Sequence, residues 1–401
     1  MAAAAGSTRK IFQPTAARIP RRRTSEEGVS NMKRYKGILA ATLLIVGLVS
    51  LALAGGGWGR GSASTAPFKA AWIYVGPHND GGWSQAHDQG RLYVQKMLGG
   101  KVQTTYKENI AVGSQFNQTV AGLAAQGYKL IFATSYGYIT PAIAAKYPNI
   151  LFEQATGTLV TKNVAEYFGR AEDTVFLSGM AAGAATKTGK IGYVVAYPIP
   201  EVIRHANAFA LGAQYTHPGA TVKLVWTHSW FNPSAEKKAA QSLVASGCDV
   251  IGQNVDSPAA GQYSETAKVP WVGYDSNAQK FAPKSWLTAS VYNWGPYYLK
   301  RVQAAMNGTW KPGFYYGTIK DGFTTLAPYG PSVTAKTKLA IAGMKTKLEN
   351  GSYYEFTGPL YDQSGKLRVP KGVRMQVLTG GTNSLYGMNW LVKGVIGSAK
   401  G

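Results

Sequence analysis

The sequence predicts an α/β protein in which two similar lobes, each a doubly wound parallel sheet, are joined by a hinge. Three observations predict it. Short apolar runs alternate with amphipathic stretches of helix length, and one pattern recurs after about 120 residues. Hydrophobic residues make up 45% of the 401-residue chain, which is enough to build a large core.

The first lobe is predicted from seven alternating elements. The strands are expected at 70–76, 102–107, 130–134 and 150–153, and the helices at 84–98, 113–126 and 140–147. Apolar strands of this length, separated by amphipathic helices, are typical of a parallel sheet covered on both faces.

The second lobe repeats this pattern. Its strands are expected at 191–195, 222–226, 250–253, 271–274 and 287–291, and its helices at 202–215, 234–245, 259–267 and 296–306. The segment AAQGYKLIFATS, from residue 124, resembles LVASGCDVIGQNVDS, from residue 243, and Gly127 and Gly247 fit helix C-terminal caps. The likeness indicates a duplicated lobe and therefore a cleft between two facing sets of loops.

The chain is accordingly divided into four parts: an N-terminal extension with a signal segment (1–66), the first lobe (67–188), the second lobe (189–310) and a C-terminal segment (311–401). The last part is rich in Gly, Pro and Tyr, with one expected helix at 333–350. We expect it to return across both lobes and supply the hinge.

The N-terminal extension carries an unbroken apolar stretch at 37–54, behind Lys33, Arg34 and Lys36 and ending in Ala-Leu-Ala. A basic start, an apolar core and such an ending describe a cleaved secretory signal, which predicts a periplasmic protein. An uncleaved membrane anchor is the alternative, because about 18 apolar residues is the lower limit for a span. Met1 and Met32 are both candidate starts.

The net charge of +23 does not indicate nucleic-acid binding. Residues 1–66 hold ten Lys/Arg and two Glu, so they carry +8 and the remainder carries +15. The lysines of the remainder are scattered singly, whereas nucleic-acid binding favours a basic patch. Cys248 is the only cysteine, so no internal disulfide forms, and we expect it to be a small buried core residue.

The tract GPHNDGGWSQAHDQG, residues 76–90, follows the first predicted strand and is the strongest candidate for a site. Ligands bind at the carboxyl ends of strands in open α/β sheets. Trp83 offers a stacking ring and Asp80 an acceptor for N–H or O–H donors, a pair that suits a flat ligand with polar edges. The alternative is structural: Trp83 packs under the helix and Asp80 caps it.

Aromatic and acidic residues recur where the other predicted strands end. The candidates there are Tyr136, Glu153, Trp230, Asp256, Asp275 and Trp294. Purely structural loops more often carry Gly, Asn or Pro. The recurrence favours an aromatic clamp around a planar heterocycle.

These segments carry a resemblance. They occur in the order GPHNDGGWSQAHDQG, TSYGY, FEQATG, YPIPEV, HSWFNP, GYDSNAQ and NWGPYY, with NSLYGMNWLVKGVIG near the C-terminus. This order of segments resembles the basic membrane protein family of PnrA-like substrate-binding lipoproteins. The resemblance runs from about residue 70 to the C-terminus. It implies the type I periplasmic-binding-protein fold, service to an ABC importer, and no enzymatic activity or cofactor.

The resemblance also implies roles for individual residues. Trp83 and Trp230 match the two rings, one from each lobe, that hold a purine. Asn79 and Asp80 match the pair that reads the base, and Asp275 matches the carboxylate that nucleoside receptors place on ribose hydroxyls. The expected partners are a purine base or nucleoside and the permease subunits, for a monomer that touches the membrane only through the permease.

Two departures from the family pattern bear on the ligand and the anchor. Nucleoside-binding relatives carry a lysine soon after the strand expected at 287–291, whereas here no lysine precedes Lys300 and the bulky Trp294 lies nearby. This points to a free base such as adenine, with Asp80, Glu153 or Asp256 as acceptors. A nucleoside, or a sugar or amino acid on the same fold, remains the alternative. No cysteine follows the apolar stretch, so a lipid anchor is not expected.

An enzyme is the competing class. The five histidines show no HExxH or other metal spacing, and the chain has no G-x-S-x-G elbow, no P-loop and no G-x-G-x-x-G after a strand. The sequence therefore favours capture of a ligand by hinge closure over catalysis.

Overall fold

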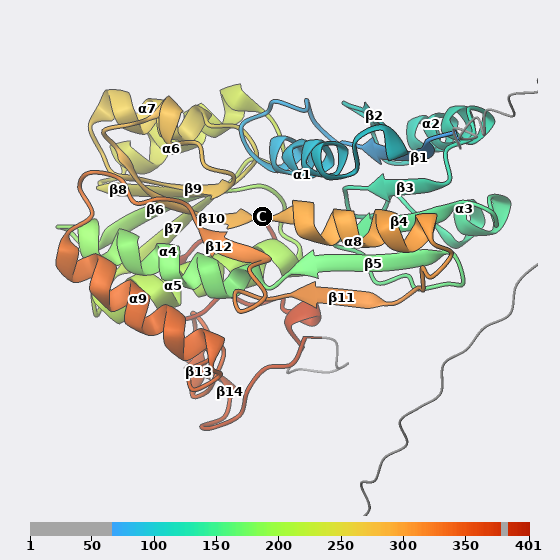
Figure 1. Ribbon diagram of the computed structural model, residues 1–401. Coiled ribbons are helices and arrows are strands. Elements are labelled where there is room, and N and C mark those ends of the chain that lie inside the picture. Colours follow the sequence, from blue (N-terminus) through green and yellow to red (C-terminus); the bar gives the residue numbers. More distant parts are fainter. Residues whose placement is uncertain (1–65, 378–383) are drawn as a thin grey trace, which may run out of the picture. The chain divides into compact units, whose positions relative to one another are not determined.

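Two mainly parallel sheets, each with helices on both faces, make up the part of the chain that the computed structural model describes, residues 66–377 and 384–401 (Figure 1). The chain divides into two units, Met1–Ala63 and Ser64–Gly401. The signal segment expected at 37–54 and both candidate start methionines lie outside the described residues.

The first sheet has the strand order β11-β5-β4-β3-β1-β2, and every neighbouring pair is parallel. Its strands are β1 (Phe68–Ile73), β2 (Val102–Lys107), β3 (Leu130–Ala133), β4 (Leu151–Ala155), β5 (Val164–Gly169) and β11 (Phe314–Gly317). Successive residues of β1 enter different cores: Trp72 stacks on Phe132, whereas Ile73 packs with Phe116. Such alternation is expected of a strand whose two faces are both covered.

The second sheet has the order β12-β10-β9-β8-β6-β7-β15. Its strands are β6 (Lys190–Val195), β7 (Thr221–Trp226), β8 (Val250–Asn254), β9 (Trp271–Asp275), β10 (Trp286–Tyr292), β12 (Thr324–Leu326) and β15 (Val395–Ile396). Only the β10–β12 pair is antiparallel. The orders β2-β1-β3-β4-β5 and β7-β6-β8-β9-β10 are equivalent, which agrees with the predicted duplication and gives each lobe a doubly wound sheet.

Helices cover both faces of each sheet (Figure 1). In the first lobe they are α1 (Trp83–Leu98) and α8 (Trp294–Met306) on one face, and α2 (Ser114–Ala125) and α3 (Pro141–Lys146) on the other. In the second they are α4 (Ala171–Ala185) and α5 (Pro200–Thr216) on one face, and α6 (Pro233–Ala245) and α7 (Ala259–Ala267) on the other. Three short 3-10 turns are η1 (Gly99–Lys101), η2 (Gln279–Phe281) and η3 (Leu385–Gly387).

Local sequence explains several helix ends. The Asn232 side chain accepts a hydrogen bond from the Ala235 amide at 3.1 Å, and Pro233 occupies the first turn of α6. Gly127 and Gly247, just past the ends of α2 and α6, have φ of 79° and 89°. This left-handed geometry is the one expected of C-terminal caps.

Helix α4 has no counterpart among the expected elements. Its residues are mostly apolar, and thirteen of the fifteen, Glu172 and Asp173 included, are buried between α5, α9 (Ala335–Glu349) and the second sheet. A helix buried on every side lacks the amphipathic pattern by which a helix is recognised in sequence.

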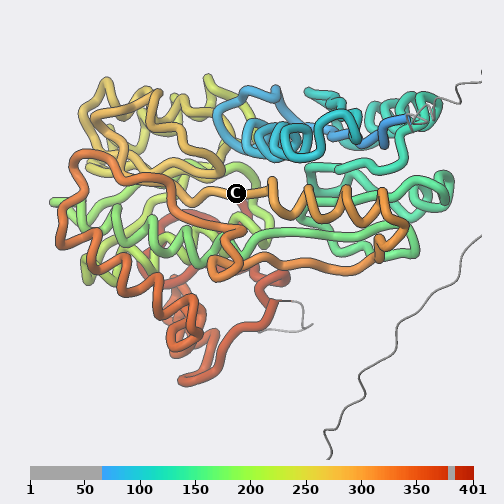
Figure 2. Tube along the Cα trace, in the orientation of Figure 1, coloured from blue at the N-terminus to red at the C-terminus, as the bar shows by residue number. Residues whose placement is uncertain are grey.

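The chain passes between the two sheets three times, as the trace in Figure 2 shows. The passages lie between β5 and α4, between β10 and α8, and between β11 and β12. The expected lobe boundary at 188/189 follows α4, although α4 already packs on the second sheet. The boundary at 310/311 likewise follows α8, although α8 packs on α1 of the first lobe.

Residues 311–401 contribute to both sheets. Strand β11 pairs with β5, β12 with β10, and β15 with β7, while α9 packs on α4. The small antiparallel pair β13 (Leu360–Tyr361) and β14 (Leu367–Val369) completes this part.

Within the described residues, no helix combines the length and apolar character that a membrane crossing requires. Cys248 is buried and unpaired, as expected of a small core residue.

Candidate functional site

A small cleft lies between the carboxyl ends of the strands of the two sheets, and each lobe supplies half of its lining. The first lobe contributes Val75, Trp83, Ser135, Tyr136 and Thr156. The second contributes Glu201, Trp230, Asp256, Tyr274 and Asp275. This is the edge at which doubly wound sheets bind ligands, because the loops beside the point where the strand order reverses leave a crevice there.

The two lobes touch across this cleft. The Ser276 hydroxyl donates a hydrogen bond to the Gly81 carbonyl. Gly82 lies so close to the second lobe that a Cβ on it would stand 2.2 Å from the Asp256 carbonyl oxygen. The cavity measures about 30 Å³, room for one or two waters, whereas ligand pockets measure hundreds of Å³. The lobes must therefore separate to admit an organic ligand.

Trp83 is the first residue of α1 and is held rigidly. Its indole N–H donates to the Thr134 carbonyl at 2.6 Å, and its ring meets those of Tyr292 and Trp294 edge-on, with centroids 5.6 and 5.4 Å away. These contacts fix the plane of the ring, which leaves little conformational entropy to lose when a ligand stacks on it.

Trp230 lies in the loop after β7 and is half-buried, with the ring of Tyr197 at 5.3 Å in an edge-on arrangement. Its carbonyl accepts a hydrogen bond from the Asp256 amide at 2.9 Å. The loops after β7 and β8 are thereby tied together. The two tryptophans thus reach the same cavity from opposite lobes.

Two carboxylates end neighbouring strands of the second sheet. Asp275 closes β9 and is 1% exposed, and Asp256 follows β8 and is 4% exposed. Within the described residues, both carboxylate oxygens of Asp275 and one of Asp256 have no hydrogen-bond partner. Buried acceptors without partners are costly, so such a group indicates a place where a ligand donates.

The backbone is strained at the same edge of the sheets. Asp275 has φ of 67° and Thr156, after β4, has φ of 66°. This left-handed region is unfavourable for a β-branched residue such as threonine, and strain of this kind concentrates at ligand sites. The Thr156 hydroxyl also has no partner in the described part of the chain.

The cleft is acidic. Burial, and then the charge of Asp80, raise the pKa of both Asp256 and Asp275 well above the usual range. Burial also raises the pKa of Glu201 to about 7, against the opposing charge of Arg204. The lining that the described residues form contains no Lys, Arg or His. The cleft therefore suits a neutral or cationic ligand rich in N–H or O–H donors and disfavours phosphates and carboxylates.

Asp80 and Asn79 are placed differently from the lining residues. The Asp80 carboxylate accepts hydrogen bonds from the amides of Gly82, Ser84 and Gln85 at 2.9 to 3.0 Å, and it thus caps α1. Asn79 is exposed at the start of this loop. The contacts of Asp80 are therefore those of the structural alternative, in which it caps the helix. Its charge still contributes to the raised pKa of Asp256 and Asp275.

Glu153 and Trp294 also lie outside the cavity lining. Glu153 is fully buried in the middle of β4, where Tyr297, Arg301 and Trp310 donate hydrogen bonds to it. Its acceptor capacity is used inside the first lobe. Trp294 is 1% exposed, and its ring packs edge-on against the ring of Trp83.

Of the nine residues expected at the site, the structure brings five to the cleft: Trp83, Tyr136, Trp230, Asp256 and Asp275. Tyr136 is 61% exposed and stands at the mouth. The other five lining residues were not among these nine, although the sequence places Ser135, Thr156, Glu201 and Tyr274 at the strand exits expected to face the cleft. Val75 carried no polar or aromatic signal. Among the described residues, no group of three or more His, Cys, Asp or Glu could hold a metal ion.

Fold and cleft together define a bilobal solute-binding protein. The family of PnrA-like ABC transporter substrate-binding proteins matches residues 68–347 of the chain. The chain belongs to this family, which confirms the predicted resemblance.

Two relatives support this assignment. A purine-binding protein of Brucella abortus is 38% identical over 329 residues, which cover 82% of this chain and 92% of the relative. A Haloferax volcanii protein, named as an ABC transporter glucose-binding protein, is 35% identical over 76% of this chain and 78% of its own length.

Solved structures show the same fold at low sequence identity. An ABC transporter solute-binding protein of Aeropyrum pernix superimposes with a TM-score of 0.64, at 15% identity, over 71% of this chain and 92% of that chain. One of Conexibacter woesei gives 0.61 at 19% identity, over 72% and 98%. The predicted type I periplasmic-binding-protein fold is thereby confirmed.

Proposed function

We propose that the protein captures a purine between its lobes outside the cytoplasm and delivers it to the permease of an ABC importer. One observation carries the proposal: Trp83 and Trp230 reach one cleft from opposite lobes, beside the buried, unpartnered carboxylates of Asp256 and Asp275. Two rings suit the two faces of a base, and carboxylates suit its N–H edges. The purine-binding relative at 38% identity supports the same ligand class.

Within this class we propose a free base, with adenine favoured, over a nucleoside. None of the described residues that line the cleft is cationic, so a ribose would find acceptors but no ammonium partner among them. A flat base also requires less opening of a cavity of about 30 Å³ than a nucleoside does. Trp294 does not add to this preference, because it packs against Trp83 outside the cleft lining and takes no space from a ribose.

Capture proceeds by closure of the hinge. In an open form the base stacks on one tryptophan, and the second lobe then brings its own ring over the exposed face. Closure is completed by the contacts of Gly81 and Gly82 with Ser276 and Asp256. A permease that engages both lobes would then distinguish the closed form from the open one.

Isothermal titration tests the proposal. The protein is unfolded and refolded to remove carried-over ligand and titrated with adenine, guanine, adenosine, inosine and glucose. Tight binding of a base with weak nucleoside binding supports the proposal. A preference for nucleosides would contradict the free-base part, and failure of every purine to bind would contradict the ligand class.

A sugar is the second candidate, because the Haloferax volcanii relative is named as glucose-binding and because aromatic rings and carboxylates also suit sugars. Glucose in the same titration separates the two. Binding of glucose without binding of any purine would replace the first proposal with this one.

A further inference from the structure

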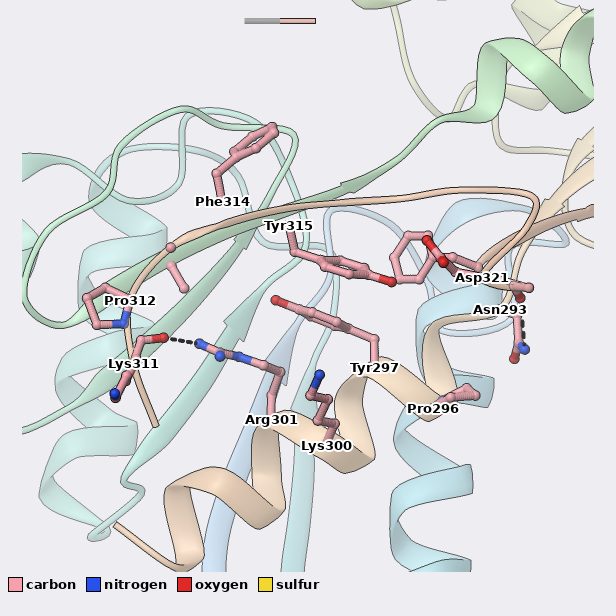
Figure 3. A pocket seen from close by; sticks show the side chains of 14 residues that line it. Asn293, Pro296, Tyr297, Lys300, Arg301, Lys311, Pro312, Phe314, Tyr315 and Asp321 are labelled. Carbon is pink, nitrogen blue, oxygen red and sulfur yellow. Dashed lines mark hydrogen bonds between the residues drawn. The ribbon is translucent and has the colours of Figure 1, made fainter. Parts of the chain in front are cut away.

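A second cavity, larger than the interlobe cleft, lies on the first lobe. It measures about 430 Å³, within the range of small-molecule sites, and lies between α8 and β11 on the first lobe (Figure 3). The segments 311–313 and 321–323 complete its walls. We call it the α8–β11 cavity.

Aromatic side chains form one wall of this cavity. The rings of Tyr297 and Tyr315 lie face to face at its centre, with centroids 4.9 Å apart and planes 19° apart (Figure 3). Phe323 meets both rings edge-on, at 5.9 and 5.3 Å. Because Tyr315 is only partly buried, its ring offers a flat surface on which a planar ligand can stack.

The charge of the α8–β11 cavity is opposite to that of the cleft. Lys300, Arg301 and Lys311 line it, against a single carboxylate, Asp321. Arg301 is already engaged, because it pairs with buried Glu153 and donates to the Lys311 carbonyl at 2.9 Å. The ammonium groups of Lys300 and Lys311 make no ion pair with any described residue. They remain able to bind an anion.

The cavity also touches two of the three passages between the lobes. Asn293, between β10 and α8, donates from its amide to the Phe323 carbonyl at 2.8 Å. Its side chain donates to the Gly322 carbonyl at 3.3 Å, just before β12. A ligand in the cavity would contact both passages, and a hinge moves through such connecting residues.

From these features we infer that the α8–β11 cavity is a second binding site, which takes a planar organic anion and biases the opening of the lobes. The aromatic wall selects a flat ligand, the free lysines select negative charge, and the contact with two passages couples occupancy to the hinge. This inference goes beyond the capture of a purine and does not depend on it.

Titration of the full chain with three probes tests the site. Adenosine monophosphate and 4-hydroxybenzoate are anions of different size that each carry a planar ring, and inorganic phosphate carries charge without a ring. We expect at least one planar anion to bind one-to-one, and phosphate to bind at least about tenfold more weakly, because it cannot stack. Which of the two planar anions binds distinguishes a nucleotide from a smaller aromatic acid.

Variants assign the site. The double change Lys300→Glu and Lys311→Glu should weaken anion binding by at least about tenfold, whereas Lys336→Glu, an exposed charge on α9, should leave it unchanged. Trp83→Ala should also leave it unchanged. Loss of anion binding in Trp83→Ala would place the anion in the cleft. Unchanged anion binding in the double variant would show that Lys300 and Lys311 do not bind the anion. Either result overturns the proposed site.

Small-angle scattering tests the coupling. Saturation with the bound anion should change the radius of gyration of the ligand-free chain, and the double lysine variant should not respond. Binding without any change in dimensions would overturn the coupling while leaving the site.

Discussion

The Ser276 hydroxyl donates a hydrogen bond to the Gly81 carbonyl, and this bond joins the two lobes beside the cleft. Ser276 directly follows Asp275, whose carboxylate lines the cleft, and Gly81 lies two residues before Trp83. The residues that would contact a ligand and those that hold the lobes together therefore belong to the same two loops. A ligand that orders these loops favours closure.

Ser276→Ala should weaken ligand binding by about three- to tenfold, because a net hydrogen bond contributes about 0.5–1.5 kcal/mol to the closed form. The loss should appear as faster dissociation, measured by stopped-flow fluorescence. Ser234→Ala is the matched control, because Ser234 is exposed on α6 and is not among the residues that line the cleft. An unchanged dissociation rate in Ser276→Ala would mean that this bond does not hold the lobes closed.

Trp230→Ala should weaken purine binding by about tenfold or more, because a stacked aromatic face is worth about 1–3 kcal/mol per base. Trp83→Ala should weaken it similarly but should also lower the melting temperature, because Trp83 is packed against Tyr292 and Trp294 whereas Trp230 is half-buried. Titration and thermal melts separate the two effects. Unchanged affinity in both variants would defeat the two-ring clamp.

The fold was largely predictable because its strands are buried on both faces. The expected strand at 102–107 coincides with β2 and the expected helix at 259–267 coincides with α7. Burial of this kind also explains what was missed. Strand β5 and helix α4 follow one another without amphipathic contrast, since both are covered on all sides.

The residues of the site could be predicted from the sequence only through their position at the ends of predicted strands. Trp230, Asp256 and Asp275 were found because they lie at or just after the carboxyl ends of predicted strands. Asp80 and Glu153 were selected on the same grounds, but the amides at the start of α1 donate to Asp80. Glu153 lies inside β4 and meets Arg301 from α8, which is distant in sequence. Whether a carboxylate faces a cleft or a neighbouring helix depends on such tertiary contacts.

Asp275→Asn should stabilise the ligand-free protein and weaken ligand binding. The change removes a buried carboxylate without partners, and asparagine tolerates the φ of 67° at this position. We expect a higher melting temperature without ligand and a smaller rise when ligand is added, measured by differential scanning calorimetry. If Asp275 contacts ribose hydroxyls, as the resemblance implies, nucleoside binding should suffer more than base binding. The opposite order would mean that Asp275 reads the base.

Closure of the ligand-free lobes should depend on pH. Glu201, Asp256 and Asp275 line the cleft, with Asp80 and Glu236 nearby, and burial is the largest cause of the raised pKa of each of them. Arg204 is the cation that opposes the shift at Glu201.

The sign follows from proton linkage. An acid whose pKa is higher in the closed form binds more protons there, so acid pH favours closure, and the preference is lost as pH rises through the raised pKa, about 7 for Glu201. The radius of gyration of the ligand-free protein should therefore increase between pH 5 and 8. A donor-rich ligand takes the place of these protons, so its binding should release protons, measured by titration calorimetry in buffers of different ionisation enthalpy. A radius of gyration that does not change with pH, together with no proton release on binding, would contradict this prediction. It would show that the cleft carboxylates have the same pKa in the open and closed forms.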